Sequence, residues 1–260
     1  MLLIDAHCHL DHVFFKDDLD QVIERAKKAG VKVIITSGIN PESNRKALAL
    51  AEKFDIIKVS LGIYPVDALA KEIEVGEYPM QPAVFNVDEE IEFIRKNKDK
   101  SIAVGECGLD YYWIKNKNKE QQEVFSKLIS LAEKIKKPII VHTRKAEEDC
   151  VTMLECSKLK NIILHCFSGK KNLVKSASDK GWYFTVPTNV VRSQQFQEMV
   201  KMVNIAQLLT ETDAPYLSPF KEKKNEPAFV AETIKKIAEI KKMDQEEVAN
   251  NIFMNYQRIF

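Results

Sequence analysis

The sequence has few cysteines, glycines and prolines, and almost no net charge. Its five cysteines include no CxxC pair, which argues against a disulfide framework and favours a reducing compartment. The 39 Lys and Arg residues against 38 Asp and Glu leave a formal net charge of +1. Because no global basic field attracts nucleic acid, a polyanion would have to be held by a local patch or by a metal.

Long apolar runs are also absent. No segment approaches the roughly 18 consecutive apolar residues of a membrane helix, and the first residues lack the pattern of a secretory signal. With 45% hydrophobic and 30% charged residues, the composition is typical of a globular protein. We therefore expect a cytoplasmic protein without a membrane partner. A monomer fits this composition, but the sequence leaves the oligomeric state open.

Eight short apolar segments recur along the chain, and most of them are rich in Val and Ile on both faces. This pattern is typical of strands that are buried on both sides in a parallel sheet. The segments begin at Leu2, Val31, Ile56, Ser101, Pro138, Asn161, Trp182 and Ala206.

Segments with helical periodicity lie between these strands, and one of them stops at Gly30, a typical residue after a helix end. Another begins near Pro227, a residue suited to a first helical turn. Eight strands alternating with helices predict an α/β protein, a TIM (β/α)8 barrel in which residues 1–260 form a single domain. A doubly wound open sheet is the alternative. It would need a Gly-rich turn after the first strand, and DAHCHLDH has none.

Three segments fall outside the regular alternation. Residues 70–87 contain two prolines and predict a loop with a short helix. Residues 218–226 predict a basic loop after the eighth strand. Asp244, followed three positions later by Glu247, forms a capping-box pattern that predicts an added C-terminal helix.

Six potential metal ligands lie at the carboxyl ends of the predicted strands. Two of them, His7 and His9, share one face of the first strand, because alternate side chains of an extended segment point the same way. In a parallel barrel, these strand ends meet at one mouth, and nitrogen and oxygen ligands without sulfur suit divalent ions. The six residues are His7, His9, Glu106, His142, His165 and Asp213.

Each of these residues also has a purely structural interpretation. An isolated His-x-His is a weak signal, and His142 or His165 alone could be a hydrogen-bonded core histidine. Glu106 could pair with Arg144, and Asp213 could cap the next helix. One binuclear site explains all six positions together, whereas the structural interpretations need six separate coincidences.

Four other residues near the potential ligands are not expected to bind metal. Cys8, Cys107 and Cys166 each directly follow a potential ligand, so strand alternation should turn them toward the core. His12 lies beyond the first strand and is expected in a loop or at the surface.

The ligand types suggest a division of labour between two metal ions. The His-x-His pair would hold one ion, and His142 with His165 would hold the other. Glu106 would bridge the ions, and Asp213 would complete the first shell beside a water. Two ions about 3.5–4 Å apart convert such a water to metal-bound hydroxide and stabilise charge on the breaking bond. Asp213, as proton acceptor, and Glu106 are the candidate catalytic residues. The ligand set suits Zn, Mn, Mg or Ni without selecting one.

Five blocks resemble, in the same order, those of the TatD family of metal-dependent hydrolases: DAHCHLD, GECGLDYY, VHTRKAEED, HCFSG and ETDAPYL. The resemblance runs from Ile4 to Phe260 and includes the NEPAFV and NYQRIF segments. It implies a TIM barrel and a divalent-metal phosphodiesterase or deoxyribonuclease, typically one that removes nucleotides from the 3′ end of single-stranded DNA. By motif, it also implies the same six metal ligands.

The chain departs from the family pattern in two places. After the third strand, the family usually has GxHPH, but this chain has GIYPVDA, with Tyr64 and Val66 in place of histidines. Loss of those histidines would favour another leaving group, or loss of nuclease activity. Before NEP, the family usually carries an Arg-Gly pair, where this chain has Lys221, Lys223 and Lys224. Lysine attracts phosphate without the bidentate geometry of arginine.

Substrate contacts are expected from the loops that follow the strands. The candidate substrate-binding residues are Arg144, Ser168 and Tyr64, whereas Lys170 and Lys171 fit a solvated face better. The aromatic run 111–113 is suited either to stacking on a nucleobase or to core packing.

Three functions stay open at this point. The first is an exonuclease acting on single-stranded DNA ends. The second is a D-aminoacyl-tRNA deacylase, or another ester hydrolase, that uses the same metal centre on a tRNA 3′ end. The third, a scaffold that binds metal without turnover, does not account for the added carboxylate base.

Overall fold

The computed structural model describes residues 1–70 and 84–260. Its eight strands are all parallel and follow one another in chain order around one sheet. The strands are β1 (Leu3–Cys8), β2 (Val31–Ser37), β3 (Ile57–Ile63), β4 (Ala103–Asp110), β5 (Ile139–Arg144), β6 (Ile162–Leu164), β7 (Tyr183–Pro187) and β8 (Leu208–Glu211). All eight predicted strands are therefore confirmed. β8 also lies against β1, so that the barrel is nearly closed, and this confirms the TIM barrel over the open sheet.

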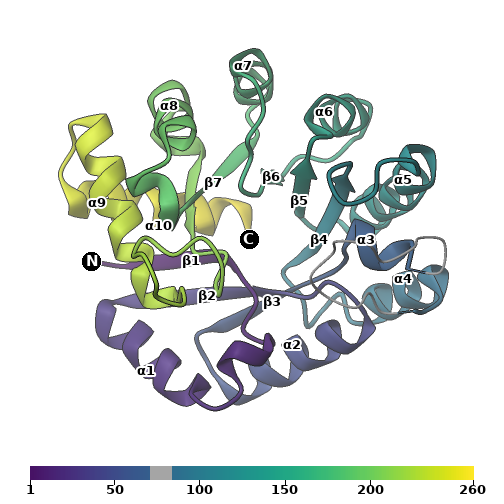
Figure 1. Cartoon of the computed structure of the whole chain (residues 1–260), viewed down its shortest axis with the longest axis horizontal. Coiled ribbons are helices and arrows are strands. Elements are labelled where there is room, and N and C mark those ends of the chain that lie inside the picture. Colours follow the sequence, from purple (N-terminus) through teal and green to yellow (C-terminus); the bar gives the residue numbers. More distant parts are fainter. Residues whose placement is uncertain (71–83) are drawn as a thin grey trace.

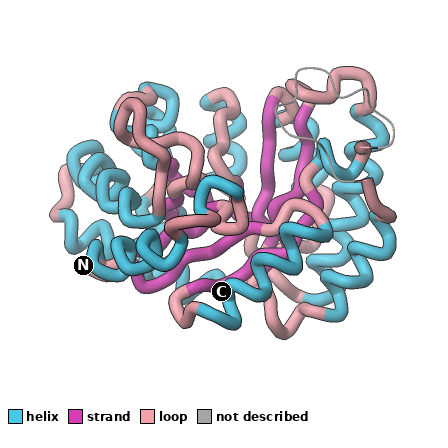
Figure 2. The backbone as a smooth tube through the Cα atoms, turned by 60° about the horizontal axis from the view of Figure 1, so that its bottom comes forward, coloured by secondary structure: helices cyan, strands magenta, loops and turns pink. Residues whose placement is uncertain are grey.

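Helices surround this sheet (Figures 1 and 2). They are α1 (Leu19–Ala29), α2 (Pro41–Lys53), α3 (Pro65–Ala68), α4 (Val87–Lys96), α5 (Asn118–Ile135), α6 (Glu147–Glu155), α7 (Lys171–Asp179), α8 (Gln194–Met202), α9 (Val230–Lys241) and α10 (Gln245–Ile259). Short 3₁₀ helices lie at Val13–Phe15, Thr188–Val191, Ile205–Gln207 and Pro227–Phe229. Among the described helices, none has both the length and the apolar character that a membrane crossing needs.

The ends of several helices follow from local sequence. Gly30 adopts a left-handed conformation, with φ of 95°, directly after α1, which side chains other than glycine rarely allow. Asp244 caps α10 by accepting a hydrogen bond from the Glu246 N–H at 2.7 Å, as the sequence predicts. Residues 218–226 form the predicted loop. The loop predicted over residues 70–87 falls largely outside the described residues.

The barrel closes between β1 and β8 through hydrogen bonds from side chains and strand ends. The Thr210 hydroxyl donates to the Ile4 carbonyl at 2.6 Å, and the Thr212 N–H donates to the buried Asp5 carboxyl at 2.8 Å. At the mouth, the Asp213 N–H donates to the His7 carbonyl at 2.9 Å. This seam joins the two ends of the sequence at the place where the potential ligands lie.

The hydrophobic core fills the barrel interior and the layer between strands and helices. Its largest fully buried side chains include Phe15, Phe125, Phe167 and Phe184. Cys8 and Cys107 are buried with no exposed surface, as predicted. Burial of these apolar groups stabilises a rigid frame, by about 25 cal/mol per Å² removed from water, on which the polar strand ends are fixed.

Candidate metal centre

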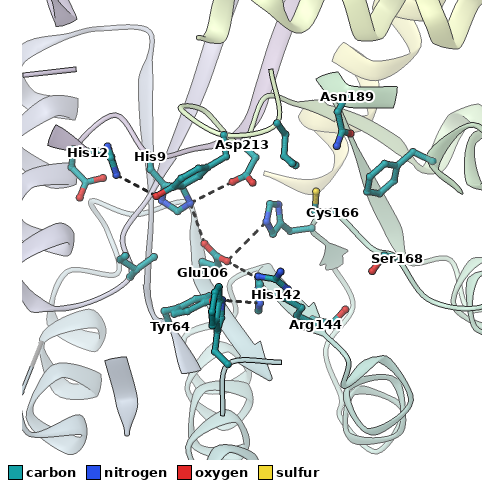
Figure 3. A pocket seen from close by; sticks show the side chains of 18 residues that line it. His9, His12, Tyr64, Glu106, His142, Arg144, Cys166, Ser168, Asn189 and Asp213 are labelled. Carbon is teal, nitrogen blue, oxygen red and sulfur yellow. Dashed lines mark hydrogen bonds and ion pairs between the residues drawn. The ribbon is translucent and has the colours of Figure 1, made fainter. Parts of the chain in front are cut away.

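A pocket of about 460 Å³ opens at the carboxyl ends of the strands. Five of the six predicted ligands line it, and the sixth, His7, lies directly beneath with no exposed surface. Figure 3 shows His9, Glu106, His142 and Asp213 pointing toward one another from different strands. The structure therefore brings together residues that the sequence separates by up to two hundred positions.

Glu106 lies at the centre of this arrangement, and its carboxylate is only 3% exposed. Its Oε2 atom is 3.3 Å from the Nε2 atoms of both His7 and His9. Its Oε1 atom is 3.0 Å from His142 Nδ1 and 4.0 Å from His165 Nε2. Each oxygen of one carboxylate thus faces a different pair of imidazoles.

Asp213 lies on the side of the first pair, with Oδ1 at 3.7 Å from His7 Nε2 and 3.6 Å from His9 Nε2. We call His7, His9 and Asp213 the first half of the centre, and His142 with His165 the second half. Glu106 connects the two halves.

Among the described residues, three groups have ligand atoms that all lie within 4.8 Å of one another. They are His7, Glu106 and His165; His7, His9 and Asp213; and His165, Cys166 and Asp213. His142 belongs to none of these groups and joins the cluster only through Glu106.

In the first half, the ring nitrogens that face away from the cluster contact a single residue, Ser37. The Nδ1 atom of His7 is 3.0 Å from the Ser37 hydroxyl, and that of His9 is 3.1 Å from the Ser37 carbonyl. Because a carbonyl oxygen only accepts, His9 Nδ1 carries a proton, so the neutral ring would present the lone pair of Nε2 to a cation in the cluster.

In the second half, buried carboxylates contact the ring nitrogens that face away from the cluster. His142 Nε2 is 3.1 Å from Asp110 Oδ2, and His165 Nδ1 is 2.6 Å from Glu211 Oε2. Neither carboxylate has exposed surface. In the neutral imidazole, both would hold the proton on the outer nitrogen and leave the inward nitrogen as an acceptor, which is the form that binds a metal. The donor set and these partners therefore fit divalent ions.

The pKa shifts of the two carboxylates in the cluster agree with a site for divalent ions. Burial alone would raise the pKa of Glu106, but His142, His7 and His9 hold it well below its usual range. Burial would also raise the pKa of Asp213, but contact with His9 and the charges of nearby histidines outweigh it and lower the pKa. Both carboxylates are therefore ionised at neutral pH.

The histidines differ among themselves. Burial lowers the pKa of His7, and the neighbouring His165 adds to this effect. Burial also disfavours the charged form of His142, but Asp110 and Glu106 outweigh it and raise the pKa to about 9. Similar contacts with carboxylates raise the pKa of His9 and His165 above its ordinary value.

The backbone at the site has unusual conformations. Asp213 and Cys166 both have positive φ, at 54° and 47°, which is uncommon for residues other than glycine. Gly62 on β3 packs so closely that an added Cβ would lie 2.3 Å from the Glu106 carbonyl oxygen. Asn225 donates to the Thr212 carbonyl at 2.7 Å and so fixes the segment that carries Asp213.

The three candidate substrate-binding residues, Tyr64, Arg144 and Ser168, also line the pocket. The Tyr64 hydroxyl donates to Asp110 at 2.7 Å. Val66, the other departure from the family pattern, is fully buried with Leu69 and Ile114 in a small core and does not line the pocket. Of these two positions, only Tyr64 therefore lines the pocket.

One expectation about a neighbouring residue was wrong. Cys166 does not point into the core: it is half-buried, lines the pocket and belongs to one of the potential ligand groups. The strand β6 ends at Leu164, and the positive φ of Cys166 breaks the alternation on which the prediction rested. His12 lies in the loop after β1, as predicted, and it also lines the pocket, where its ring nitrogen is 3.2 Å from the Tyr216 hydroxyl.

The sequence analysis missed the residues behind the histidines, namely Ser37, Asp110 and Glu211. A usable signal existed for two of them. Asp110 lies four residues after Glu106 in β4, and Glu211 lies two residues before Asp213, so the two-residue period of a strand would predict each of them on the same face as a ligand.

The chain is similar to known proteins over its whole length. The family described as TatD related DNase matches residues 4–260. An uncharacterized metal-dependent hydrolase of Methanocaldococcus jannaschii is 39% identical over 259 residues, which are 99% of this chain and 96% of that protein. Human deoxyribonuclease TATDN3 is 30% identical over 263 residues, covering 99% of this chain and 94% of that protein. The crystal structure of a TatD homolog from Escherichia coli superposes with a TM-score of 0.86 at 25% identity, covering 99% and 97% of the two chains.

Proposed function

The chain belongs to the TatD family of metal-dependent hydrolases, and from this premise we propose that it is a cytoplasmic phosphodiesterase with a binuclear metal centre. Its proposed reaction is the removal of nucleotides from the 3′ end of single-stranded DNA. The name of the human relative, a deoxyribonuclease, supports a DNA substrate.

The observation that carries the proposal is the orientation of Glu106. One of its oxygens faces His7 and His9, and the other faces His142 and His165. A carboxylate placed between two sets of imidazoles is suited to bridging two divalent ions. Asp213 supplies a further carboxylate, which lies 3.6–3.7 Å from the first pair and within 4.8 Å of a ring nitrogen of His165.

The residues around the pocket have distinct roles in this proposal. Bound divalent ions supply Lewis acidity, which activates water and neutralises charge on the phosphate. Asp213, ionised and in contact with the first pair of histidines, accepts the proton of the attacking water. Arg144 and Ser168 orient the phosphate, for which a planar guanidinium offers two parallel N–H groups. The bond from phosphorus to the 3′ oxygen then breaks.

The alternative, deacylation of D-aminoacyl-tRNA, is favoured by one observation. Tyr64 stands where the family usually has histidine, and its hydroxyl is held by Asp110 in the pocket. If the family histidine contacts the substrate, this exchange changes which ester the site accepts. The metal centre would be the same for both reactions.

The test uses protein that has been stripped of metal and reloaded separately with Mg²⁺, Mn²⁺ and Zn²⁺. Each form is incubated with end-labelled single-stranded DNA and, in parallel, with D- and L-aminoacyl-tRNA. The proposal predicts a metal-dependent ladder of DNA shortened from the 3′ end. Intact DNA together with D-selective deacylation would favour the alternative, and no reaction with either substrate would contradict both.

Two variants show whether turnover comes from this site. Asp213→Ala should abolish it, because the proton acceptor is lost. Asp55→Asn changes an aspartate that is 82% exposed and precedes β3 at the opposite end of the barrel, so it should leave turnover unchanged. Equal activity in both variants would assign the cleavage to a contaminant.

A further inference from the structure

The rim of the pocket beside β4 and β5 carries an aromatic cluster with one arginine. The guanidinium carbon of Arg144 lies 3.9 Å from the centre of the Tyr112 ring and 5.2 Å from that of Trp113. The two rings meet edge to face, with centres 4.8 Å apart at 81°. Trp113 and Arg144 line the pocket, and Tyr112, which is 42% exposed, backs the arginine. We call these three residues the stacking ledge.

The ledge is fixed relative to the candidate metal centre by Asp110. Its Oδ1 atom accepts the backbone N–H groups of Tyr112 and Trp113, both at 3.0 Å. Its Oδ2 atom contacts His142 at 3.1 Å and accepts from Tyr64 at 2.7 Å. One buried carboxylate therefore holds both a potential ligand and the backbone of the ledge. A site fixed in this way before binding loses less entropy when a ligand arrives.

The chemistry of the ledge matches one kind of ligand group. Nucleobases stack on aromatic rings and on guanidinium planes, and unpaired bases do so most readily. Tyr112 covers one face of the Arg144 guanidinium, and the N–H groups at its edge are the part that binds phosphate. A flat apolar surface beside a phosphate-binding edge fits a nucleotide, in which base and phosphate are joined through one sugar.

Resting on the proposed function, we propose that the stacking ledge is the subsite for the base of the terminal nucleotide. The base stacks on Trp113, while Arg144 holds the phosphate of the same nucleotide over the metal centre. The subsite makes the enzyme selective for ends whose last base is present and unpaired. It does not select a particular base, because every base has a stacking face.

The first test measures equilibrium binding by calorimetry on the metal-loaded protein, with 2′-deoxyadenosine 5′-monophosphate and with deoxyribose 5-phosphate as probes. Trp113→Leu should weaken binding of the nucleotide by about 5- to 150-fold, and Trp113→Phe should restore most of it. Binding of the sugar phosphate, which has no base, should be equal in all three proteins. Equal weakening for both probes would mean that Trp113 only supports the fold, and it would overturn the proposal.

A matched control uses the other side of the mouth. Phe14 is an aromatic residue that is 60% exposed and contacts His12 with ring centres 4.6 Å apart. Phe14→Leu should leave nucleotide binding unchanged. If it weakens binding as much as Trp113→Leu, the base is not bound at the ledge.

A second test separates this proposal from the nuclease proposal. Wild-type protein should cleave a strand with a normal 3′ end faster than one ending in an abasic nucleotide, and Trp113→Leu should remove this preference. Cleavage without any such preference would overturn the ledge but leave the nuclease proposal standing. Absence of DNA cleavage, with base-dependent binding retained, would overturn the nuclease proposal and leave the ledge standing.

Discussion

The two halves of the candidate metal centre hold equal numbers of histidines but support them differently. Behind His7 and His9 lies Ser37, which contributes a hydroxyl and a carbonyl. Behind His142 and His165 lie two fully buried carboxylates, Asp110 and Glu211. The negative charge of the first half lies inside the cluster, on Asp213. That of the second half lies behind the imidazoles, on Asp110 and Glu211.

This difference has consequences for how each half would bind a cation. A carboxylate behind an imidazole fixes its orientation and increases its basicity, and such partners typically change metal affinity by about 10- to 100-fold. A hydroxyl or carbonyl fixes orientation with less effect on basicity. The second half therefore depends on residues that never touch the ion, and the first half depends on Asp213 itself.

The largest expected effect comes from removing the connection between the halves. Glu106→Gln keeps the shape of the side chain but removes the charge that both halves share. We expect turnover to fall by on the order of 10³-fold, because charge stabilisation and water activation are both lost. Metal content, measured by mass spectrometry after dialysis, should fall together with turnover. Glu239→Gln, at a glutamate that is 69% exposed on α9, is the control, and wild-type metal content in Glu106→Gln would contradict the bridging role.

The second prediction compares the carboxylate behind His165 with the serine behind His7 and His9. Glu211→Gln should weaken binding of one of the two ions by about 10- to 100-fold, since His165 loses its charged partner. Ser37→Ala should cost less, about fivefold, because the carbonyl that contacts His9 remains and the lost hydroxyl contacts only His7 and the Ser60 hydroxyl, without a charged partner such as Glu211. Calorimetric titration of metal-stripped protein with Mn²⁺ measures both. Equal losses in the two variants would remove the distinction between the halves.

Metal binding in the second half should depend on pH, because His142 has a raised pKa. With a pKa of about 9, His142 carries a proton at pH 7 in the metal-free protein, and an ion that binds its Nδ1 must displace that proton. Affinity in the second half should therefore rise with pH, by up to about tenfold per unit, and level off above pH 9. Titrations at pH 6.5, 7.5 and 8.5 test this sign. Asp110→Asn should lower the pKa and flatten the dependence, whereas a flat wild-type profile would place His142 outside the metal site.

The smallest effect is expected at Tyr64. Tyr64→Phe removes the hydrogen bond to Asp110 but leaves the contact between Asp110 and His142 in place. Loss of one such bond costs about 1.5–3 kcal/mol when the acceptor is charged and less when solvent replaces the donor. We expect metal affinity to fall less than tenfold, with the thermal unfolding midpoint nearly unchanged. A loss as large as that of Glu211→Gln would make Tyr64 a main support of the second half.

Much of this architecture could be predicted from the sequence because its signals are local. The eight strands follow from short apolar runs, and the ligands lie at their ends, where a parallel barrel gathers side chains whatever the details of packing. The pairing of His7 with His9 needed only the two-residue period of a strand.

The supports behind the ligands could not be predicted with the same ease. Ser37, Asp110 and Glu211 are single polar residues within apolar strands, and their roles depend on which ring nitrogen of a neighbouring strand they meet. The alternation rule fails at Cys166 because β6 ends at Leu164 and the backbone of Cys166 has positive φ. The positions of such turns follow from tertiary contacts, such as those that Asn225 makes to the loops beside it.

The seam between β1 and β8 also sets the order in which the centre is assembled. It joins residues as far apart as Ile4 and Thr210, which are 206 positions apart, and Asp213 reaches the cluster only when β8 docks. During synthesis, the residues of the second half and Glu106 all leave the ribosome before Asp213 does. Since long-range strand pairing forms slowly, the carboxylate proposed to accept a proton is the last of the six residues to reach the centre. The proposed catalytic group would thus be put in place by the same step that completes the barrel.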